Sequence, residues 1–120
     1  MLIKQLEDIE PFIKNDRLSL WEIFHPKNDA VKDCPSVSLS EIKDYTNPRK
    51  SKSAEYCIIL EGEGKLYGDT RSIDVKPYMA IYIAPGERYR LENRNSGKPL
   101  RCIHITYPAW KPELEEEIKL

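Results

Sequence analysis

The sequence lacks any apolar run that approaches the roughly 18 residues of a membrane span. Its first ten residues, MLIKQLEDIE, also lack the apolar core of a secretory signal peptide. An excess of either charge is missing as well, because 19 basic and 20 acidic side chains give a net charge of −1. A nearly neutral chain has no overall field that attracts nucleic acid or anionic lipid. We therefore expect a cytoplasmic protein without a nucleic-acid or membrane partner.

The motifs of several common enzyme classes are missing too. There is no P-loop, no dinucleotide-binding GxGxxG and no hydrolase nucleophile elbow. The three cysteines, Cys34, Cys57 and Cys102, include no CxxC pair, and an odd number leaves one thiol over from any pairing. In a cytoplasmic protein such thiols stay reduced. The sequence therefore gives no support to phosphate, dinucleotide or dithiol chemistry.

Short segments rich in β-forming residues occupy most of the chain, and nine prolines and five glycines indicate frequent turns between them. The predicted strands cover residues 18–24, 36–42, 56–60, 80–84, 89–93 and 100–107, and residues 64–75 indicate a hairpin with its turn at Gly68-Asp69. Eight or nine strands at this spacing favour an antiparallel sandwich or barrel. We expect one domain over residues 1–120, with an N-terminal arm at 1–17, a barrel at 18–108 and a tail at 109–120.

The helical signal lies in the tail, KPELEEEIKL. Pro112 suits the first turn of a helix, the glutamates that follow suit its N-terminal end, and Leu114 and Ile118 would share one face. At most two turns can form, so this helix must dock to persist. The predicted fold class is therefore all-β with a short C-terminal helical tail.

Two stretches carry the pattern of a known family. EYCIILEGEG (residues 55–64) places Glu55 seven residues before Gly62, and YIAPGERYRLEN (residues 82–93) contains Gly86 and Asn93. In this register the chain resembles the small single-domain cupins over roughly residues 18–108. The resemblance implies a double-stranded β-helix, the jelly-roll barrel of the cupins. Small cupins commonly pair through their sheets, so the resemblance also implies a homodimer.

The metal-binding positions of that family are the part that this sequence changes. Where the family has two histidines one residue apart, the shorter spacing places Arg49 and Ser51 here and the longer spacing places Pro48 and Lys50. The later ligand histidine is replaced by Tyr89. Of four expected ligands, Glu55 alone remains. A transition metal needs several converging imidazole or carboxylate ligands. We therefore expect no metal and no other cofactor.

Glu55 and His104 are the candidate catalytic residues. Period-two alternation places Glu55 on one face with Cys57 and places His104 on one face with Cys102, so both side chains can point into the barrel and act as acid or base. The structural alternatives are a strand-start glutamate paired with a neighbouring cation, and a hydrogen-bonded histidine of the core.

Arg49, Ser51 and Tyr89 are the candidate ligand contacts. The stretch RKSKS (residues 49–53) would line the barrel mouth with positive charge and capture an anion, and the Tyr89 phenol would donate a hydrogen bond. A solvated basic loop and an aromatic plug are the structural alternatives for these two features.

Three functions remain open on this basis. The first is a metal-free cupin that binds a small polar or anionic metabolite in the barrel. The second is a cofactor-independent isomerase or epimerase of a sugar or keto acid, which needs a base beside a carbonyl and a donor for its oxygen. The third is a structural or protein-interaction module whose barrel is filled by Tyr78, Tyr89 and Ile59. A metal held in a non-standard way by Glu55, His104 and Cys57 is a further alternative.

Overall fold

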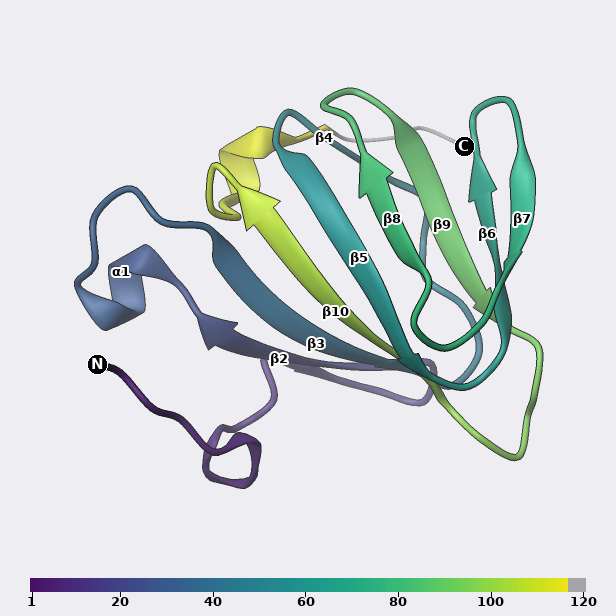
Figure 1. The fold of residues 1–120 in the computed structure, drawn as a ribbon, viewed down its shortest axis with the longest axis horizontal. Coiled ribbons are helices and arrows are strands. Elements are labelled where there is room, and N and C mark those ends of the chain that lie inside the picture. The colour runs from purple at the N-terminus through teal and green to yellow at the C-terminus, as the bar shows by residue number, and fades with distance from the viewer. Residues whose placement is uncertain (117–120) are drawn as a thin grey trace.

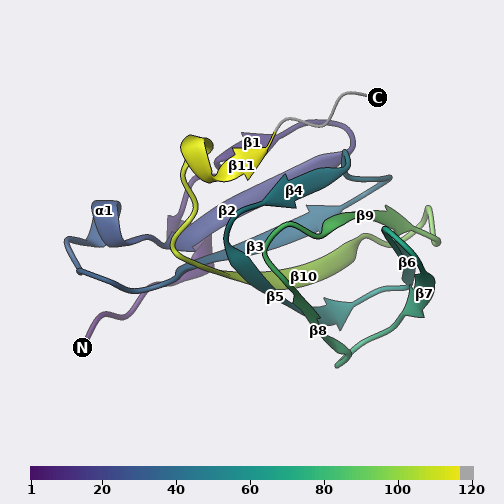
Figure 2. The same ribbon diagram turned by 90° about the horizontal axis from the view of Figure 1, so that it is seen from above.

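The computed structural model describes residues 1–116, which form two antiparallel sheets that face each other (Figure 1). The first sheet has six strands in the order β1-β2-β3-β10-β5-β8, and the second has five in the order β11-β4-β9-β6-β7. Seen from above, both sheets curve around a common interior (Figure 2). The predicted all-β jelly-roll architecture is confirmed. No helix within residues 1–116 is long and apolar enough to cross a membrane.

The predicted strands agree closely with those observed, and short segments are added at the edges. The strands are β1 (Ile13–Lys14), β2 (Leu18–Phe24), β3 (Ser36–Ile42), β4 (Arg49–Ser51), β5 (Ala54–Glu61), β6 (Gly64–Gly68), β7 (Ser72–Val75), β8 (Ala80–Ile83), β9 (Arg88–Asn93), β10 (Leu100–Tyr107) and β11 (Glu115–Glu116). The helical turns are η1 (Leu6–Asp8), α1 (Pro26–Asp29) and η2 (Pro112–Leu114).

β10 lies in the middle of the six-stranded sheet, between β3 and β5. Its burial alternates, so that Leu100, Cys102, His104 and Thr106 face the interior. Side chains directly opposite one another on antiparallel strands are neighbours on one face of the sheet. The register therefore builds rows of inward side chains across the whole sheet, and one of these rows carries His104.

The apolar core fills one half of the barrel. Its buried members come from both sheets and are Ile42, Cys57, Ile59, Leu66, Val75, Ile83, Tyr89, Leu91, Leu100 and Cys102. Burial of apolar area at roughly 25 cal/mol per Å² is the main stabilising contribution that holds the two sheets together. The other half of the interior lies between β2, β3 and β10 on one side and β4 and β9 on the other, and it has a different lining.

The tail departs from the predicted two-turn helix. Helical geometry is confined to the 3₁₀ turn η2, and the next two residues form β11, which pairs with β4. Glu115 contacts Arg49 at 3.0 Å and Glu116 contacts Lys50 at 3.2 Å, so the backbone and side chains both favour the strand. A helix this short has too few internal hydrogen bonds to compete. Ile118 and the rest of the predicted helix lie outside the described residues.

Two further local predictions need correction. The basic stretch at residues 49–53, for which a solvated loop was an alternative, contains β4, which pairs with β9. The hairpin turn lies one residue later than predicted, at Asp69-Thr70, since the Gly68 N–H donates to the Arg71 carbonyl at 2.8 Å. Gly68 extends β6 instead, because it also lies opposite Tyr89 of β9.

The glycines and the asparagine of the family pattern have structural roles. Gly62 and Gly86 have φ values of +92° and +86°, where a side chain is strained. A Cβ at Gly62 would also lie 2.6 Å from the Pro99 carbonyl oxygen. The Asn93 side chain donates to three backbone carbonyls and so ties β9 to the β3 end and to its own following turn.

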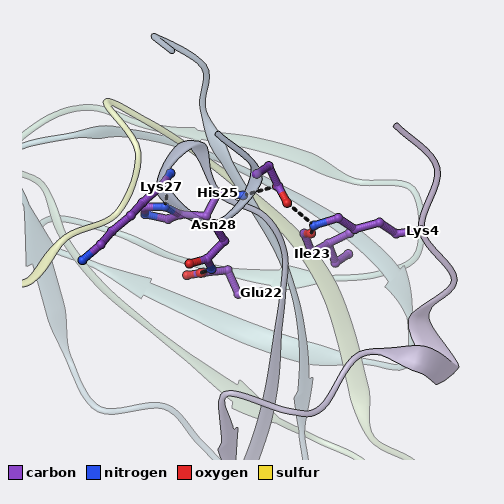
Figure 3. A network of polar contacts seen from close by, with 7 residues as sticks. Lys4, Glu22, Ile23, His25, Lys27 and Asn28 are labelled. Atoms are coloured by element: carbon purple, nitrogen blue, oxygen red, sulfur yellow. Dashed lines mark hydrogen bonds and ion pairs between the residues drawn. The ribbon is translucent and has the colours of Figure 1, made fainter. Parts of the chain in front are cut away.

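Polar contacts fix the N-terminal arm to the end of β2 (Figure 3). The Lys4 ammonium donates to the Ile23 carbonyl at 2.7 Å and contacts the Asp29 carboxylate at 2.6 Å. Asp29 in turn accepts a hydrogen bond from the His25 amide at 3.0 Å. The Lys4 hydrogen bond, with the one from His25, holds the pKa of Asp29 below its usual value. The arm is therefore part of the ordered fold.

Candidate functional site

A cavity of about 310 Å³ occupies the half of the barrel that the apolar core leaves open. Its floor is polar. Three alternate residues of β3, Ser36, Ser38 and Ser40, line it together with His104 and Thr106 of β10. Residues two apart on a strand share a face, so the sequence SVSLSEI turns all its serines to the same side. The serines were not among the residues predicted from sequence, although their alternation was visible there.

The register explains why these polar groups meet. Ser38 lies opposite His104 on one neighbouring strand and opposite Glu22 on the other. His104 in turn lies opposite Cys57 of β5. Glu22, Ser38, His104 and Cys57 therefore form one row across four strands, with Glu22 in the cavity lining and Cys57 in the core.

The walls of the cavity are mostly apolar. Phe12 and Trp110 pack edge to face there, with ring centroids 5.8 Å apart. The Trp110 amide donates to the Ser36 hydroxyl at 2.9 Å, which fixes the aromatic wall to the polar floor. Trp110 thus belongs to the cavity lining. The remaining apolar lining comes from Ile13, Leu18, Leu20 and Leu91.

Arg49, Glu55 and Tyr89 form a network that joins the two sheets. Arg49 of β4 and Tyr89 of β9 lie opposite each other, and Glu55 reaches them from β5. The Arg49 Nη2 atom lies 2.8 Å from Glu55 Oε1, an ion pair without good hydrogen-bond alignment, and the Tyr89 hydroxyl donates to Glu55 Oε2 at 2.5 Å. Glu55 is only 1% exposed, so both of its oxygens are used inside the protein.

The network fixes the charge states of Tyr89 and Arg49. Burial is the main cause that raises the pKa of Tyr89. The Arg49 charge lowers this pKa, whereas the charge of Glu55 and the hydrogen bond to Glu55 raise it. The net pKa of the phenol lies well above its usual value, so the phenol stays protonated. Burial lowers the pKa of Arg49, but contact with Tyr89 and with the carboxylates of Glu55 and Glu115 raises it by more, so the net direction is upward and the guanidinium remains charged.

The residues at the family's metal positions do not fit a metal ion. Arg49 already places a cation beside Glu55, and Tyr89 is a neutral donor to the same carboxylate. The Ser51 hydroxyl is engaged as well, because it accepts a hydrogen bond from the Ser53 amide at 3.0 Å. A divalent ion at these four positions would meet one carboxylate, one hydroxyl, one phenol and a guanidinium, which is not a ligand set for a transition metal.

The structure separates the five predicted site residues into two groups. Arg49, Tyr89 and His104 line the cavity. Glu55 lies behind Arg49 and Tyr89, and Ser51 is buried beside Ser53, so neither is part of the cavity lining.

The predicted plug is incomplete. Tyr89 and Ile59 are buried in the core, but Tyr78 is 87% exposed on the outside of the barrel. Its φ of +71° lies in the left-handed region, in the turn before β8. An outward Tyr78 leaves the interior to the core and the cavity.

His104 also belongs to a buried cluster of soft donor atoms. A ring nitrogen of His104 and the sulfur atoms of Cys57 and Cys102 all lie within 4.8 Å of one another. The contact with Cys102, and then burial, raise the pKa of the Cys57 thiol far above its usual range. Burial lowers the pKa of His104, but Cys57 and Glu55 raise it by more, so the net direction is upward. The sequence offered Cys57 and His104 as possible ligands, but not Cys102.

The comparisons with known proteins agree with this fold. A family model described as the cupin domain matches residues 44–106, which is 63 of the 120 residues. No curated protein matches the chain.

Three solved structures illustrate the likeness. A Streptomyces nucleoside dehydratase shares 14% identity at a TM-score of 0.80, over 100% of this chain and 92% of that one. The polyketide cyclase RemF from Streptomyces resistomycificus shares 17% identity at a TM-score of 0.77, over 100% of this chain and 87% of that one. A predicted oxalate decarboxylase from Thermotoga maritima shares 14% identity at a TM-score of 0.74, over 88% of this chain and 97% of that one. At such identities the likeness shows the fold alone.

Proposed function

The chain belongs to the cupin domain family, and on that premise we propose that its barrel binds a small, neutral, hydroxyl-bearing metabolite without a metal at the family's ligand positions. The observation that carries the proposal is the cavity with a row of serines on its floor and aromatic rings on its wall. Apolar walls with a few converging polar groups are typical of small-molecule sites.

The charges beside the cavity favour a neutral ligand over an anion. Among the described residues that line it, Arg49 is the only cation, and its guanidinium is shared between Glu55 and Glu115. Glu22 adds a further carboxylate to the lining. One cation therefore faces three carboxylates, and an anion would meet net repulsion. Of the two ligand classes expected from the sequence, polar and anionic, we propose the polar one.

The size of the cavity limits the ligand. A volume of about 310 Å³ lies at the low end of the roughly 300–1,000 Å³ of small-molecule sites. A monosaccharide or a nucleoside is the class that combines this size with several hydroxyl groups. One of the similar solved structures contains uridine, which supports this class without assigning it here.

A thermal-shift screen tests the proposal. Neutral sugars and nucleosides should raise the melting temperature, whereas sugar phosphates and keto acids should not. Ser38→Ala should weaken the binding of a hit roughly fivefold, because loss of one hydrogen bond costs about 1 kcal/mol. Ser72→Ala, at an exposed position of β7, is the matched control and should leave the affinity unchanged. Shifts confined to the anions, or equal affinities of both variants, would contradict the proposal.

A cofactor-independent isomerase remains the second candidate because of one observation. His104 lines the cavity, so its imidazole is placed to act as a base on a ligand bound there. Glu55, by contrast, is committed to Arg49 and Tyr89 and serves as a positioning residue. Incorporation of solvent deuterium beside the carbonyl of a bound sugar, and its loss in His104→Gln, would support turnover over simple binding.

A further inference from the structure

Three donor atoms of the kind that soft metal ions prefer meet inside the barrel. They are the sulfur atoms of Cys57 and Cys102 and a ring nitrogen of His104, here called the Cys57–Cys102–His104 cluster. Both cysteines are 0% exposed and His104 is 7% exposed. The cysteines are free thiols. From these features we propose that the cluster binds one Zn²⁺ ion.

The cluster is close to the dimensions of a zinc site. Zinc bonds of about 2.3 Å to sulfur in a tetrahedral arrangement place two sulfur atoms roughly 3.8 Å apart. The three donor atoms here lie within 4.8 Å of one another, so the approach that they need is on the order of 1 Å, which small side-chain rotations supply. Cys57 lies on β5 and the other two on β10, and these strands pair along their length. The backbone therefore presents the donors on a rigid frame.

The hydrogen bonding of the two histidines supplies an independent observation. His25 uses both ring nitrogens, since Nε2 bonds the Trp110 carbonyl at 2.7 Å and Nδ1 accepts from the Lys27 amide at 3.1 Å. His104 differs, because its Nδ1 atom is buried and finds no hydrogen-bond partner among the described residues. Buried polar atoms are rarely left without a partner. A metal ion coordinated through Nδ1 would supply that partner.

The donor set selects zinc by charge as well as by softness. Two thiolates and one neutral imidazole balance the charge of a divalent ion, which matters because net charge is costly to bury. Hard cations such as Mg²⁺ and Ca²⁺ require oxygen ligands, which the cluster does not offer. A set of two cysteines and one histidine leaves the fourth position of a tetrahedral ion free, as in catalytic zinc sites.

The proposed site is distinct from the family's metal positions and from the serine floor. It uses none of Arg49, Ser51, Glu55 or Tyr89. Of its three members, His104 alone lines the cavity, so an ion would enter from that side. An occupied site would use His104 as a ligand, and the acid–base role considered for it would then be lost. Ligand binding on the serine floor does not depend on the ion, so the two proposals can fail separately.

Metal titration of the reduced, tag-free full chain without oxygen tests the proposal. Cobalt(II) should bind at one equivalent and produce a thiolate-to-cobalt charge-transfer band in the near ultraviolet, and one equivalent of Zn²⁺ should abolish the band. Cys102→Ser should weaken zinc binding by more than the roughly 10- to 100-fold that loss of an outer-shell partner costs. Cys34→Ser, which removes the half-buried thiol outside the cluster, is the matched control and should behave like the wild type.

The histidines give a second matched pair, with His104→Gln expected to lose the site and His25→Gln expected to keep it. Circular dichroism of the metal-free variants establishes that each is folded. If a cluster variant does not fold, the cobalt absorption spectrum of the wild type alone tests the proposed zinc site. A wild type that binds no cobalt, binds it without the thiolate band, or shows the same zinc affinity after Cys102→Ser would overturn the proposal.

Discussion

Glu55 shows how a single residue can be retained while its surroundings change its role. At the family's position for a metal ligand, its carboxylate contacts a guanidinium on one oxygen and a phenol on the other. A buried carboxylate is tolerated only where charge and hydrogen bonds compensate it. Arg49 and Tyr89 supply that compensation, and in doing so they close the position to a metal ion.

The first prediction concerns the Tyr89–Glu55 hydrogen bond. Tyr89→Phe should lower the free energy of unfolding by about 1–3 kcal/mol, because it leaves a buried carboxylate oxygen without its donor. In the Glu55→Gln background the same substitution should cost less, and the coupling energy should fall within the roughly 0.5–3 kcal/mol of contacting pairs. Urea denaturation of the wild type, the two single variants and the double variant measures this double-mutant cycle.

Tyr107→Phe is the matched control for this cycle. It removes the Tyr107 hydroxyl, which bonds Asp33 at 2.6 Å on a side chain that is 44% exposed. Water replaces that partner, so the loss should stay within about 0.5 kcal/mol. Equal costs at the two tyrosines would show that the buried network contributes no special stabilisation.

At the scale of elements, the connection between β5 and β6 depends on Gly62. Its positive φ turns the chain sharply, and the Pro99 carbonyl, one residue before β10, approaches where a side chain would start. The turn therefore fixes the strand that carries Glu55 and Cys57 relative to the strand that carries His104. A change in this turn would therefore displace the site residues as well as destabilise the fold.

Glycine substitutions separate the effect of backbone strain from the effect of a close contact with the new Cβ. Gly86→Ala should lower the free energy of unfolding by about 1–3 kcal/mol through backbone strain alone, because the φ of Gly86 is positive but no atom lies within 4 Å of the new Cβ. Gly62→Ala should cost more, since the strain is joined by a 2.6 Å contact. Gly97→Ala, with its nearest atom at 3.5 Å, should be close to neutral. Thermal unfolding gives the order, and a Gly62 variant as stable as the Gly97 variant would contradict this account.

At the scale of the whole molecule, the outer face of the six-stranded sheet is largely apolar. Tyr56 and Tyr82 lie side by side there with ring centroids 5.2 Å apart, and they are 48% and 56% exposed. Tyr56 also lies opposite Ile105 of β10. Apolar patches of this kind on a protein surface mark interaction sites. We propose that this face joins two copies of the chain.

Sedimentation velocity tests the dimer. The wild type should sediment as a dimer at micromolar concentration, and Tyr56→Glu should shift it to a monomer, because a buried unpaired carboxylate is costly. Val31→Glu places the same charge on an exposed apolar residue of a loop outside the sheets and should leave the dimer intact. A monomeric wild type, or a dimer that persists with Glu at position 56, would argue against this interface.

The sequence by itself determined the strands and much of the frame. β-forming residues in runs with two-residue alternation predicted β2, β3 and β10 with their observed ends. The family pattern placed Gly62 at a position where a positive φ requires a glycine. These features are local, since φ preferences and alternation act over a few residues, and such information is present in the sequence.

The tertiary structure alone decided what those strands build. Alternation fixed that Ser36, Ser38 and Ser40 share a face, but not that this face is the inner one, with Val37 on the other side. Strand register then placed His104 beside Cys57, and the pairing of β11 with β4 replaced the expected tail helix. The cavity, the Arg49–Glu55–Tyr89 network and the thiol cluster all join residues far apart in the chain. Their formation depends on strand pairing and on packing between the sheets, which no short stretch of sequence encodes.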